Sequence, residues 1–269
     1  MKSLVIIVLC TMLIAASPIP AVNKKPVCPT PKSLMLHSAY GPERMEQLAK
    51  EIEKAGFETI TYSQLYDLWD KGKCAPSNAI LVSVDDLSGV WLRHTFVEMI
   101  DVFIKHNMVL TLGVVTDSYD AVQDDNLWQY FKDLDKRGFE IASHSSMHYH
   151  LGQVEEKYVE SDVNDSYYII CKNLGKCPKT LILPYGDGWD SNIVLKHAKE
   201  KYRAIVSIAA GNTYGGDLFV MRRIPPYNDD QSVTIQLLND TFYLVTSGFK
   251  LPKRHFGYLH HIETEILLK

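Results

Sequence analysis

The sequence predicts a single α/β domain with the fold of a closed or nearly closed βα barrel. Short apolar runs of strand length alternate with amphipathic helical stretches along most of the chain, and this alternation is typical of a parallel sheet covered by helices. The length of 269 residues suits one large domain or two small ones. Polar residues follow several of the apolar runs, and in parallel barrels the functional groups lie at these strand ends.

The first half of the chain predicts three strands, over 33–37, 57–62 and 80–84. A helix is expected over 44–55, because Met45, Leu48 and Ile52 fall on one face and Gly56 can end it. Ser63 is placed to cap a second, short helix that runs to Trp69.

The second half continues the alternation. Helices are expected over 91–106, 127–136, 153–173 and 191–201, and strands over 108–115, 139–143, 180–183, 204–208 and 218–221.

The two ends of the chain differ from the barrel in composition. A basic start followed by the apolar run 4–16, which is too short for a comfortable membrane span, predicts a signal peptide over 1–21, with an uncleaved anchor as the alternative. A Pro- and Lys-rich linker over 22–32 then precedes a barrel over 33–230. Residues 231–269 form an extension of uncertain packing, in which 241–246 reads as one more strand. We expect a secreted or extracytoplasmic protein with no membrane span after signal cleavage.

The cysteines agree with export. Cys10 lies inside the predicted signal peptide, and four cysteines, an even number, remain in the rest of the chain. Cys171 and Cys177 flank a short turn, which favours their pairing and leaves Cys28 with Cys74, although four cysteines permit three connectivities. The formal net charge of -4 gives no electrostatic reason to expect nucleic acid. We expect a monomer.

Two adjacent carboxylates, Asp85 and Asp86, end the apolar run 80–84. Neighbouring carboxylates repel each other and are costly to desolvate unless a cation or hydrogen-bond donors lie beside them. The alternative is that both face water in a loop and that one of them caps the helix beginning near Trp91.

His144 and His148 follow another predicted strand and are four residues apart. On a helical turn they would share a face and could bind one cation, although a solvated or hydrogen-bonded pair is the simpler alternative. With one carboxylate they would form a two-histidine, one-aspartate site. Such a site leaves coordination positions open, which suits catalysis, and it fits zinc or another divalent transition ion such as cobalt or nickel.

Three segments carry a family resemblance: Ser83-Val-Asp-Asp-Leu-Ser-Gly89, His144-Ser-Ser-Met-His148 and Leu183-Pro-Tyr-Gly186. In that order they resemble the first three motifs of the polysaccharide deacetylases. This family is also called carbohydrate esterase family 4, and its domain is the NodB-homology domain. The resemblance covers about 33–227 and implies a distorted (β/α)7-type barrel, in a single domain, that hydrolyses N-acetyl groups of amino sugars. It also implies a general base at Asp85, metal ligands at Asp86, His144 and His148, and an oxyanion site at Pro184 and Tyr185, with the Tyr185 backbone N–H as donor.

The general acid is less clear from the motifs. The N-terminal layout is similar to the poly-β-1,6-N-acetylglucosamine deacetylase branch, in which the motif order is permuted and a first-strand histidine is the acid. This favours His37, since the first and last strands of a closed barrel are neighbours. The alternatives are His261, in Leu259-His-His261, and a His37 that is simply buried and bonded to backbone.

The chain departs from the family pattern in three places. The usual Asp-Asp-Gly reads Asp-Asp-Leu, the family's Asp-Trp motif is not recognised, and the arginine expected before Pro-Tyr falls at Ile182. Arg222 or Arg223 could supply the missing charge to the base, with a surface salt bridge as the alternative.

These features lead us to expect a secreted, metal-dependent N-deacetylase acting on a β-linked N-acetylglucosamine polysaccharide. A poly-β-1,6 glycan is favoured, and chitin-like or peptidoglycan-type glycans come next. The alternatives are a non-catalytic glycan-binding protein on a degenerate barrel and a plain exported structural domain. Sugar rings could stack on aromatic residues near the predicted rim, about half of which are expected to serve packing instead: Trp91, Tyr119, Tyr149, Trp189, Tyr214 and Tyr227.

Overall fold

The computed structural model describes residues 28–37, 41–88, 95–117, 125–208 and 219–223. The predicted signal peptide (1–21), most of the predicted linker and the extension 231–269, with its strand-like run 241–246, lie outside the described residues. So do five residues singled out above, namely Trp91, Tyr119, Tyr214, Tyr227 and His261. Among the described helices, none has the length and apolar character needed to cross a membrane.

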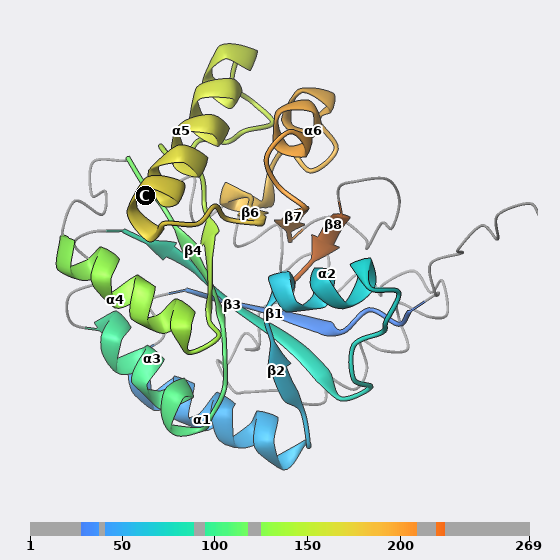
Figure 1. Cartoon of the computed structure of the whole chain (residues 1–269), viewed down its shortest axis with the longest axis vertical. Coiled ribbons are helices and arrows are strands. Elements are labelled where there is room, and N and C mark those ends of the chain that lie inside the picture. The colour runs from blue at the N-terminus through green and yellow to red at the C-terminus, as the bar shows by residue number, and fades with distance from the viewer. Residues whose placement is uncertain (1–27, 38–40, 89–94, 118–124, 209–218, 224–269) are drawn as a thin grey trace, which may run out of the picture.

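One parallel sheet forms the centre of the fold (Figure 1). Its strands follow one another in the order β1 (Lys32–His37), β3 (Ala79–Leu87), β4 (Thr111–Val114), β5 (Glu140–Ser143), β6 (Thr180–Ile182), β7 (Ala204–Ser207) and β8 (Phe219–Arg222). A short strand, β2 (Glu58–Ile60), pairs with the beginning of β3. The sheet curves into a nearly closed barrel, which confirms the predicted α/β single-domain class.

Strand β3 pairs with three other strands. It pairs with β1 along one side, and on its other side it pairs first with β2 and then with β4. The side chains of Ile80 to Val84 are fully buried, as expected for a continuous apolar run inside a parallel sheet. The strand continues to Leu87, so it passes through both aspartates instead of ending before them.

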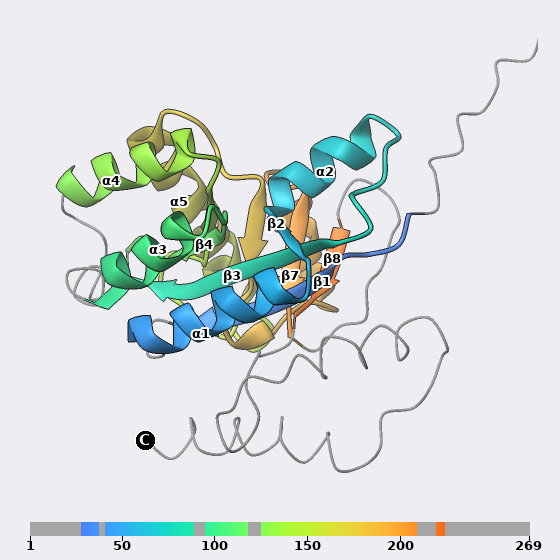
Figure 2. The same cartoon turned by 90° about the horizontal axis from the view of Figure 1, so that it is seen from below.

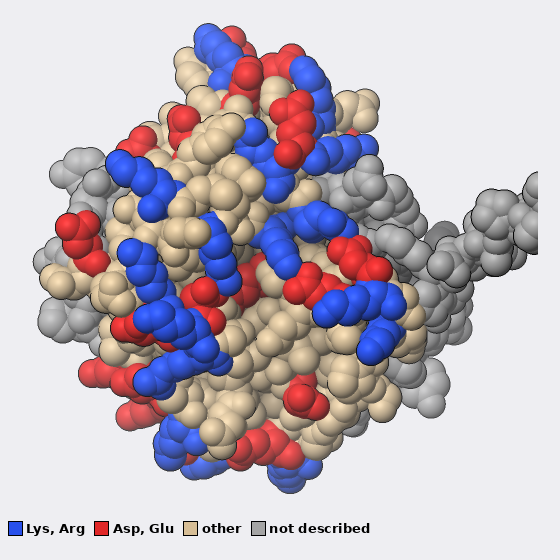
Figure 3. Space-filling view, viewed as in Figure 1, with Lys and Arg blue, Asp and Glu red and all other residues tan. Residues whose placement is uncertain are grey.

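The outer helices pack side by side around the sheet (Figures 1 and 2). In chain order they are α1 (Gly41–Lys54), α3 (Thr95–Lys105), α4 (Asp125–Lys136), α5 (Glu156–Leu174) and α6 (Asn192–Lys199). Each places an apolar stripe against the strands, as the sequence periodicity predicts. On the face seen in Figure 3, lysine and arginine side chains are interspersed with aspartate and glutamate.

Helix α2 (Tyr62–Asp70) has a different place. Its buried residues Tyr62, Leu65, Tyr66 and Trp69 pack with inward-facing residues of several strands, among them Leu81, Ala142, Ile182, Val206 and Met221. Because α2 follows β2 at the beginning of β3, it fills the amino-terminal end of the barrel and leaves the carboxyl end to polar residues.

The start of α2 corrects one expectation. Thr61, not Ser63, is the capping residue: its hydroxyl accepts a hydrogen bond from the Gln64 N–H at 3.2 Å, and the Gln64 side chain accepts from the Thr61 N–H at 2.9 Å. This reciprocal pair is a capping box. The backbone N–H of Ser63 donates instead to Glu140 Oε2 at 2.9 Å.

Glu140 is a buried carboxylate at the start of β5 that ties four elements together. Besides the Ser63 N–H, it accepts hydrogen bonds from the hydroxyls of Thr111 at 3.1 Å and Thr180 at 2.6 Å. A buried carboxylate is tolerated when its lone pairs are satisfied in this way. Glu140 therefore fixes the amino end of the barrel, far from the carboxyl ends of the strands.

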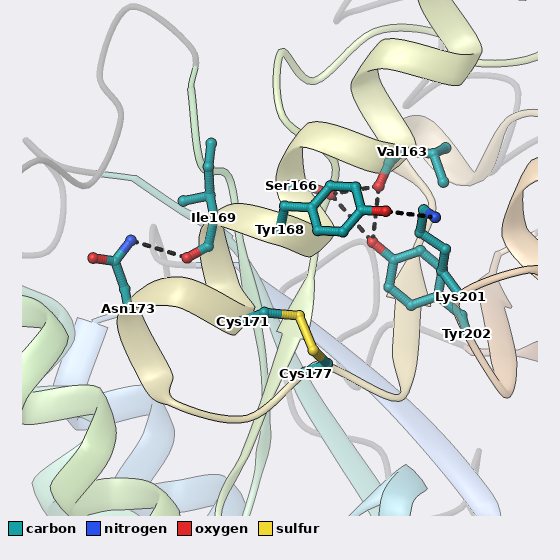
Figure 4. Close-up of a disulfide and its surroundings, with 9 residues drawn as sticks. All are labelled: Val163, Ser166, Tyr168, Ile169, Cys171, Asn173, Cys177, Lys201 and Tyr202. Atoms are coloured by element: carbon teal, nitrogen blue, oxygen red, sulfur yellow. Dashed lines mark hydrogen bonds between the residues drawn. A yellow bond between two sulfur atoms is a disulfide. The ribbon is translucent and has the colours of Figure 1, made fainter.

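Both predicted disulfides are present, Cys28–Cys74 and Cys171–Cys177. The second joins the last turn of α5 to the segment that leads into β6 (Figure 4). In the same region the Tyr202 hydroxyl donates to the carbonyl of Val163 at 3.1 Å, which fastens α5 to the chain after α6.

Replacement of the central acceptor tests the role assigned to Glu140. Glu140→Ala leaves one backbone N–H and two hydroxyls without an acceptor, so the free energy of unfolding should fall by about 3 kcal/mol. Urea unfolding followed by circular dichroism measures it. Glu51→Ala, which removes a carboxylate that pairs with Lys54 on α1 at 3.9 Å, should change it by less than about 0.5 kcal/mol. Equal effects would show that the Glu140 contacts are not what stabilises this end.

Candidate functional site

The two aspartates lie at an irregularity near the end of β3. The register with β4 shifts between Val84 and Leu87, and Asp86 has a positive φ of 61°. Consecutive residues of a regular strand point to opposite faces. A bulge next to a site changes where a side chain points, and here the Asp86 carboxylate reaches the histidines while the Asp85 side chain is buried. The alternative that both carboxylates face water is wrong for Asp85.

The histidine pair lies in a loop after β5, not on the helical turn that the spacing suggested. The His144 N–H still donates to the Val114 carbonyl at 2.9 Å, but Ser145 and His148 both have positive φ angles, of 64° and 59°. The chain therefore reverses within a few residues. This reversal, rather than helical periodicity, brings both imidazoles to one place.

A carboxylate from α5 holds this loop. Asp162, which is 2% exposed, accepts hydrogen bonds from the backbone N–H groups of Ser146, at 2.9 Å, and Met147. Asp162 is not among the residues predicted from the sequence. A signal for it was present, because Asp162 falls on the buried stripe of α5 with Val159 and Val163, where a charged residue needs a partner.

Asp86, His144 and His148 converge as the resemblance implied. Asp86 Oδ1 lies 3.2 Å from His144 Nε2 and 3.1 Å from His148 Nε2, and the two Nε2 atoms are 3.2 Å apart. One ligand atom from each residue lies within 4.8 Å of the others. Burial raises the pKa of the Asp86 carboxyl, but hydrogen bonds from His144 and His148 outweigh this and hold the pKa well below its usual range.

The outward-facing ring nitrogens of both histidines have partners. His144 Nδ1 lies 2.9 Å from the Ile182 carbonyl, and His148 Nδ1 lies 3.2 Å from the Tyr185 hydroxyl. The Ile182 carbonyl can only accept, so His144 Nδ1 carries a hydrogen toward it, and the Tyr185 hydroxyl can accept a hydrogen from His148 Nδ1. With its hydrogen on Nδ1, a neutral imidazole has a lone pair on Nε2 for a cation. Two neutral imidazoles and an ionised carboxylate are donors that suit zinc and similar divalent ions, so the residues present fit a metal.

Asp85 forms a buried ion pair with Arg223. Arg223 Nη1 donates to Asp85 Oδ1 at 2.5 Å and to the Ser83 hydroxyl at 2.8 Å, and both charged side chains are almost fully buried. Burial raises the pKa of Asp85, but the charge of Arg223 outweighs it and keeps the pKa below its usual value. Of the two candidates proposed from the sequence, Arg223 supplies the charge, and the alternative of a surface salt bridge is wrong.

Ile182, at the position of the family's arginine, belongs to the core. Its side chain is fully buried, and its Cδ1 would lie 3.1 Å from a Cβ added at Gly113. Ile182 is therefore an apolar core residue near Gly113 and provides no charge to Asp85. Ile182 contributes to the site through its backbone carbonyl, which supports His144.

His37 and the predicted oxyanion residues lie at the same end of the sheet. His37 ends β1 opposite Asp85 in the ladder, and its Nε2 lies 3.9 Å from Asp86 Oδ2. Its side chain is 37% exposed, so it is not a buried structural histidine. Pro184 and Tyr185 lie in a 3-10 turn directly after β6, where the Tyr185 ring contacts the ring of His148.

Two of the predicted rim aromatics lie among the described residues. Tyr149 and Trp189 are partly buried and pack against the hydrophobic cluster beneath α5 and α6. Both side chains therefore serve packing at least in part, which is the alternative to sugar stacking stated above.

The fold and the site together define a parallel α/β-barrel protein with a two-histidine, one-aspartate candidate metal site beside an ion-paired aspartate. Residues 72–205 match the family model of the polysaccharide deacetylases, and the chain belongs to this family. No curated protein matches the sequence.

Solved structures share the fold. A Streptococcus pyogenes deacetylase, PplD, in complex with acetate aligns with a TM-score of 0.61 at 16% identity, covering 74% of this chain and 94% of that one. A de-N-acetylase from Aggregatibacter actinomycetemcomitans gives 0.61 at 14% identity, covering 78% and 98%. IcaB from Ammonifex degensii gives 0.60 at 14% identity, covering 81% and 98%.

The Asp85–Arg223 pair yields a stability prediction. Arg223→Met leaves Asp85 buried without its counter-charge, and loss of one partner of a buried pair should lower the free energy of unfolding by about 3–5 kcal/mol. Arg203→Met removes a guanidinium of the same kind from an exposed pair with Asp70 and should change it by about 0–1 kcal/mol. Urea unfolding of both variants at neutral pH checks this. Similar losses in the two variants would contradict the stabilising role of the buried pair.

Proposed function

We propose that this chain is an exported, metal-dependent N-deacetylase that hydrolyses acetamido groups of a β-linked N-acetylglucosamine polysaccharide. The observation that carries the proposal is the convergence of Asp86, His144 and His148 within 4.8 Å, directly beside an aspartate kept ionised by Arg223. The polysaccharide deacetylase family of the chain supports the reaction class. The predicted signal peptide and the two disulfides support export.

Asp86, His144 and His148 would hold the metal ion, which we expect to be zinc, cobalt or nickel. Bound there, the ion supplies Lewis acidity toward the acetamide carbonyl and toward water. His144 is fixed by a backbone carbonyl and His148 by the Tyr185 hydroxyl, so both rings are oriented before any ligand arrives. Nearly half of the Asp86 side chain surface is exposed, which leaves the site open to substrate from the carboxyl end of the barrel.

Asp85 is assigned as the general base. Its ionised carboxylate removes a proton from the water that attacks the acetamide carbonyl carbon. Arg223 keeps Asp85 charged and fixes its orientation through Asp85 Oδ1, and the same Arg223 nitrogen, Nη1, also donates to the Ser83 hydroxyl.

The backbone N–H of Tyr185 is assigned to the oxyanion that develops on the carbonyl oxygen. His37 is assigned as the general acid. It donates a proton to the amide nitrogen as the C–N bond breaks, which releases acetate and leaves a free amine on the sugar. The pairing of β1 with β3 supports this role, because it places His37 opposite Asp85 at the rim.

The preferred substrate follows from two observations. One structurally similar protein is described as a de-N-acetylase, which favours an acetamide over an ester as the scissile group. The order of His37, α1 and the Gly56-Phe-Glu-Thr-Ile-Thr61 segment before the two aspartates is similar to the poly-β-1,6-N-acetylglucosamine branch. We therefore favour a β-1,6 glycan over chitin-like and peptidoglycan-type glycans.

A non-catalytic glycan-binding protein is the alternative function. Two sequence features favour it: Ile182 in place of an arginine, and Asp-Asp-Leu in place of the usual Asp-Asp-Gly. Arg223 gives Asp85 the positive partner that Ile182 cannot provide. The contacts of Asp85 therefore support the enzyme.

The first assay measures acetate released from β-1,6- and β-1,4-linked N-acetylglucosamine oligomers, with and without chelator, followed by addition of zinc, cobalt or nickel. We expect chelator-sensitive release, faster from the β-1,6 oligomers and restored by metal. No release from either oligomer, by protein that binds one metal ion per chain, would favour the binding protein.

Asp85→Asn separates the two functions. Loss of the base should lower kcat for acetate release by about 10²–10⁴-fold, while the metal ligands and the glycan contacts remain. Asp133→Asn, which changes an exposed carboxylate on α4, is the matched control and should keep full activity. Acetate release by Asp85→Asn at the rate of the unmodified chain would contradict the role of Asp85.

A further inference from the structure

The side chain of Tyr185 occupies a place that the oxyanion assignment does not use. That assignment concerns only the backbone N–H of Tyr185. The phenol lies 3.2 Å from His148 Nδ1, and the two rings meet edge to face with centroids 4.7 Å apart. Tyr185 also has a positive φ of 57°. A bulky residue rarely adopts this conformation unless the surrounding structure enforces it.

The turn around Tyr185 is fixed on both sides. The Gly186 N–H donates to the Leu183 carbonyl at 3.0 Å, and the Ser207 hydroxyl of β7 donates to the Gly186 carbonyl at 2.8 Å. A Cβ at Gly186 would lie 2.3 Å from Ile208 Cγ1, so only glycine allows this close approach. The turn therefore directs the Tyr185 ring toward the histidine loop.

A second histidine, His150, also packs against the Tyr185 ring. His150 stacks on Tyr185 with centroids 3.7 Å apart and an angle of 8° between the planes. His150 Nδ1 lies 3.7 Å from Asp187 Oδ2. The Asp187 carboxylate in turn lies against Gly152, where an added Cβ would be 2.5 Å from Asp187 Oδ1. Asp187, His150 and Tyr185 thus form a packed series that ends at His148.

We propose that Tyr185 is a positioning residue whose hydroxyl accepts a hydrogen bond from His148 Nδ1 and fixes the ring orientation of His148, with His150 and Asp187 supporting it. The inference rests on the proposed function in taking His148 as a metal ligand. An imidazole that binds a cation through Nε2 carries its hydrogen on Nδ1, and that hydrogen is donated to the Tyr185 oxygen. His144 obtains the same support from a backbone carbonyl, which no substitution of a side chain removes. His148 is supported by a side chain, so removal of the Tyr185 hydroxyl oxygen can change the affinity of the site for a metal ion.

Tyr185→Phe removes that atom and keeps the ring, the stack on His150 and the backbone N–H. Loss of the partner of a metal-binding histidine weakens metal affinity by about 10–100-fold. We expect the dissociation constant for zinc or cobalt, measured by competition with a chelating indicator, to rise by this factor. His150→Leu should weaken binding in the same direction. Tyr168 is an exposed residue of α5 whose hydroxyl accepts a hydrogen bond from Lys201 (Figure 4). Tyr168→Phe removes this hydroxyl and should leave the dissociation constant for metal unchanged.

Three results would overturn the inference: an unchanged dissociation constant in Tyr185→Phe, a loss that Tyr168→Phe reproduces, or a loss matched by a lower melting temperature of the metal-free variant. The metal readout also separates this inference from the proposed function. If the unmodified chain binds metal but releases no acetate, the N-deacetylase proposal fails and the Tyr185 result still stands. If the unmodified chain binds neither zinc nor cobalt, both fail.

Discussion

The buried ion pair between Asp85 and Arg223 joins the closure of the barrel to the chemistry at its rim. Arg223 follows the last described strand, and its guanidinium reaches Ser83 and Asp85 on β3 near the other edge of the sheet. A charge in the protein interior is tolerated only with an opposite charge and satisfied hydrogen bonds. Asp85 and Arg223 therefore require each other, and their pairing draws the two edges of the sheet together. The same contact keeps Asp85 ionised beside the Asp86–His144–His148 group.

The two ends of the barrel differ in the residues that line them. At the amino end, the apolar face of α2 fills the interior, and Glu140 satisfies donors from α2, β4 and β6. At the carboxyl end, side chains with exposed surface, among them His37, Asp86 and Tyr185, come from three different strands or the turns after them. Because the strands are parallel, their carboxyl ends meet on one side of the sheet. The amino end is thus packed and hydrogen-bonded, and the carboxyl end carries the candidate site.

The sequence predicted much of this arrangement for physical reasons. Buried apolar runs such as Ile80–Val84 are unambiguous in a parallel sheet, and alternation of strands with helices determines the class. The candidate metal ligands Asp86, His144 and His148 could be singled out because their residue types have few structural uses at strand ends. Features set by local conformation were less accessible: Thr61 and Ser63 are both good caps, and only the structure shows which hydroxyl meets an N–H group. Likewise, four-residue spacing of His144 and His148 fits a helix and a reversed loop equally well.

The features that the sequence did not determine depend on contacts between distant segments. Arg223 is separated from Asp85 by 138 residues, and no periodicity links them. Asp162 was detectable as a charge on a buried helical stripe, but its partners, the N–H groups of Ser146 and Met147, lie in a loop without regular dihedral angles. The stack of Tyr185 on His150 depends on a positive φ at Tyr185, which its sequence of Pro-Tyr-Gly does not specify.

X-ray absorption spectroscopy of the zinc-loaded protein tests the central claim most directly, because it reports the ligands of the ion without depending on a substrate. We expect one zinc per chain with two imidazole nitrogens at about 2.0–2.1 Å, oxygen in the remaining positions and no sulfur. We also expect that His144→Ala, His148→Ala and Asp86→Ala each remove this spectrum. Zinc bound through sulfur, or binding that survives these substitutions, would contradict the assignment of the site.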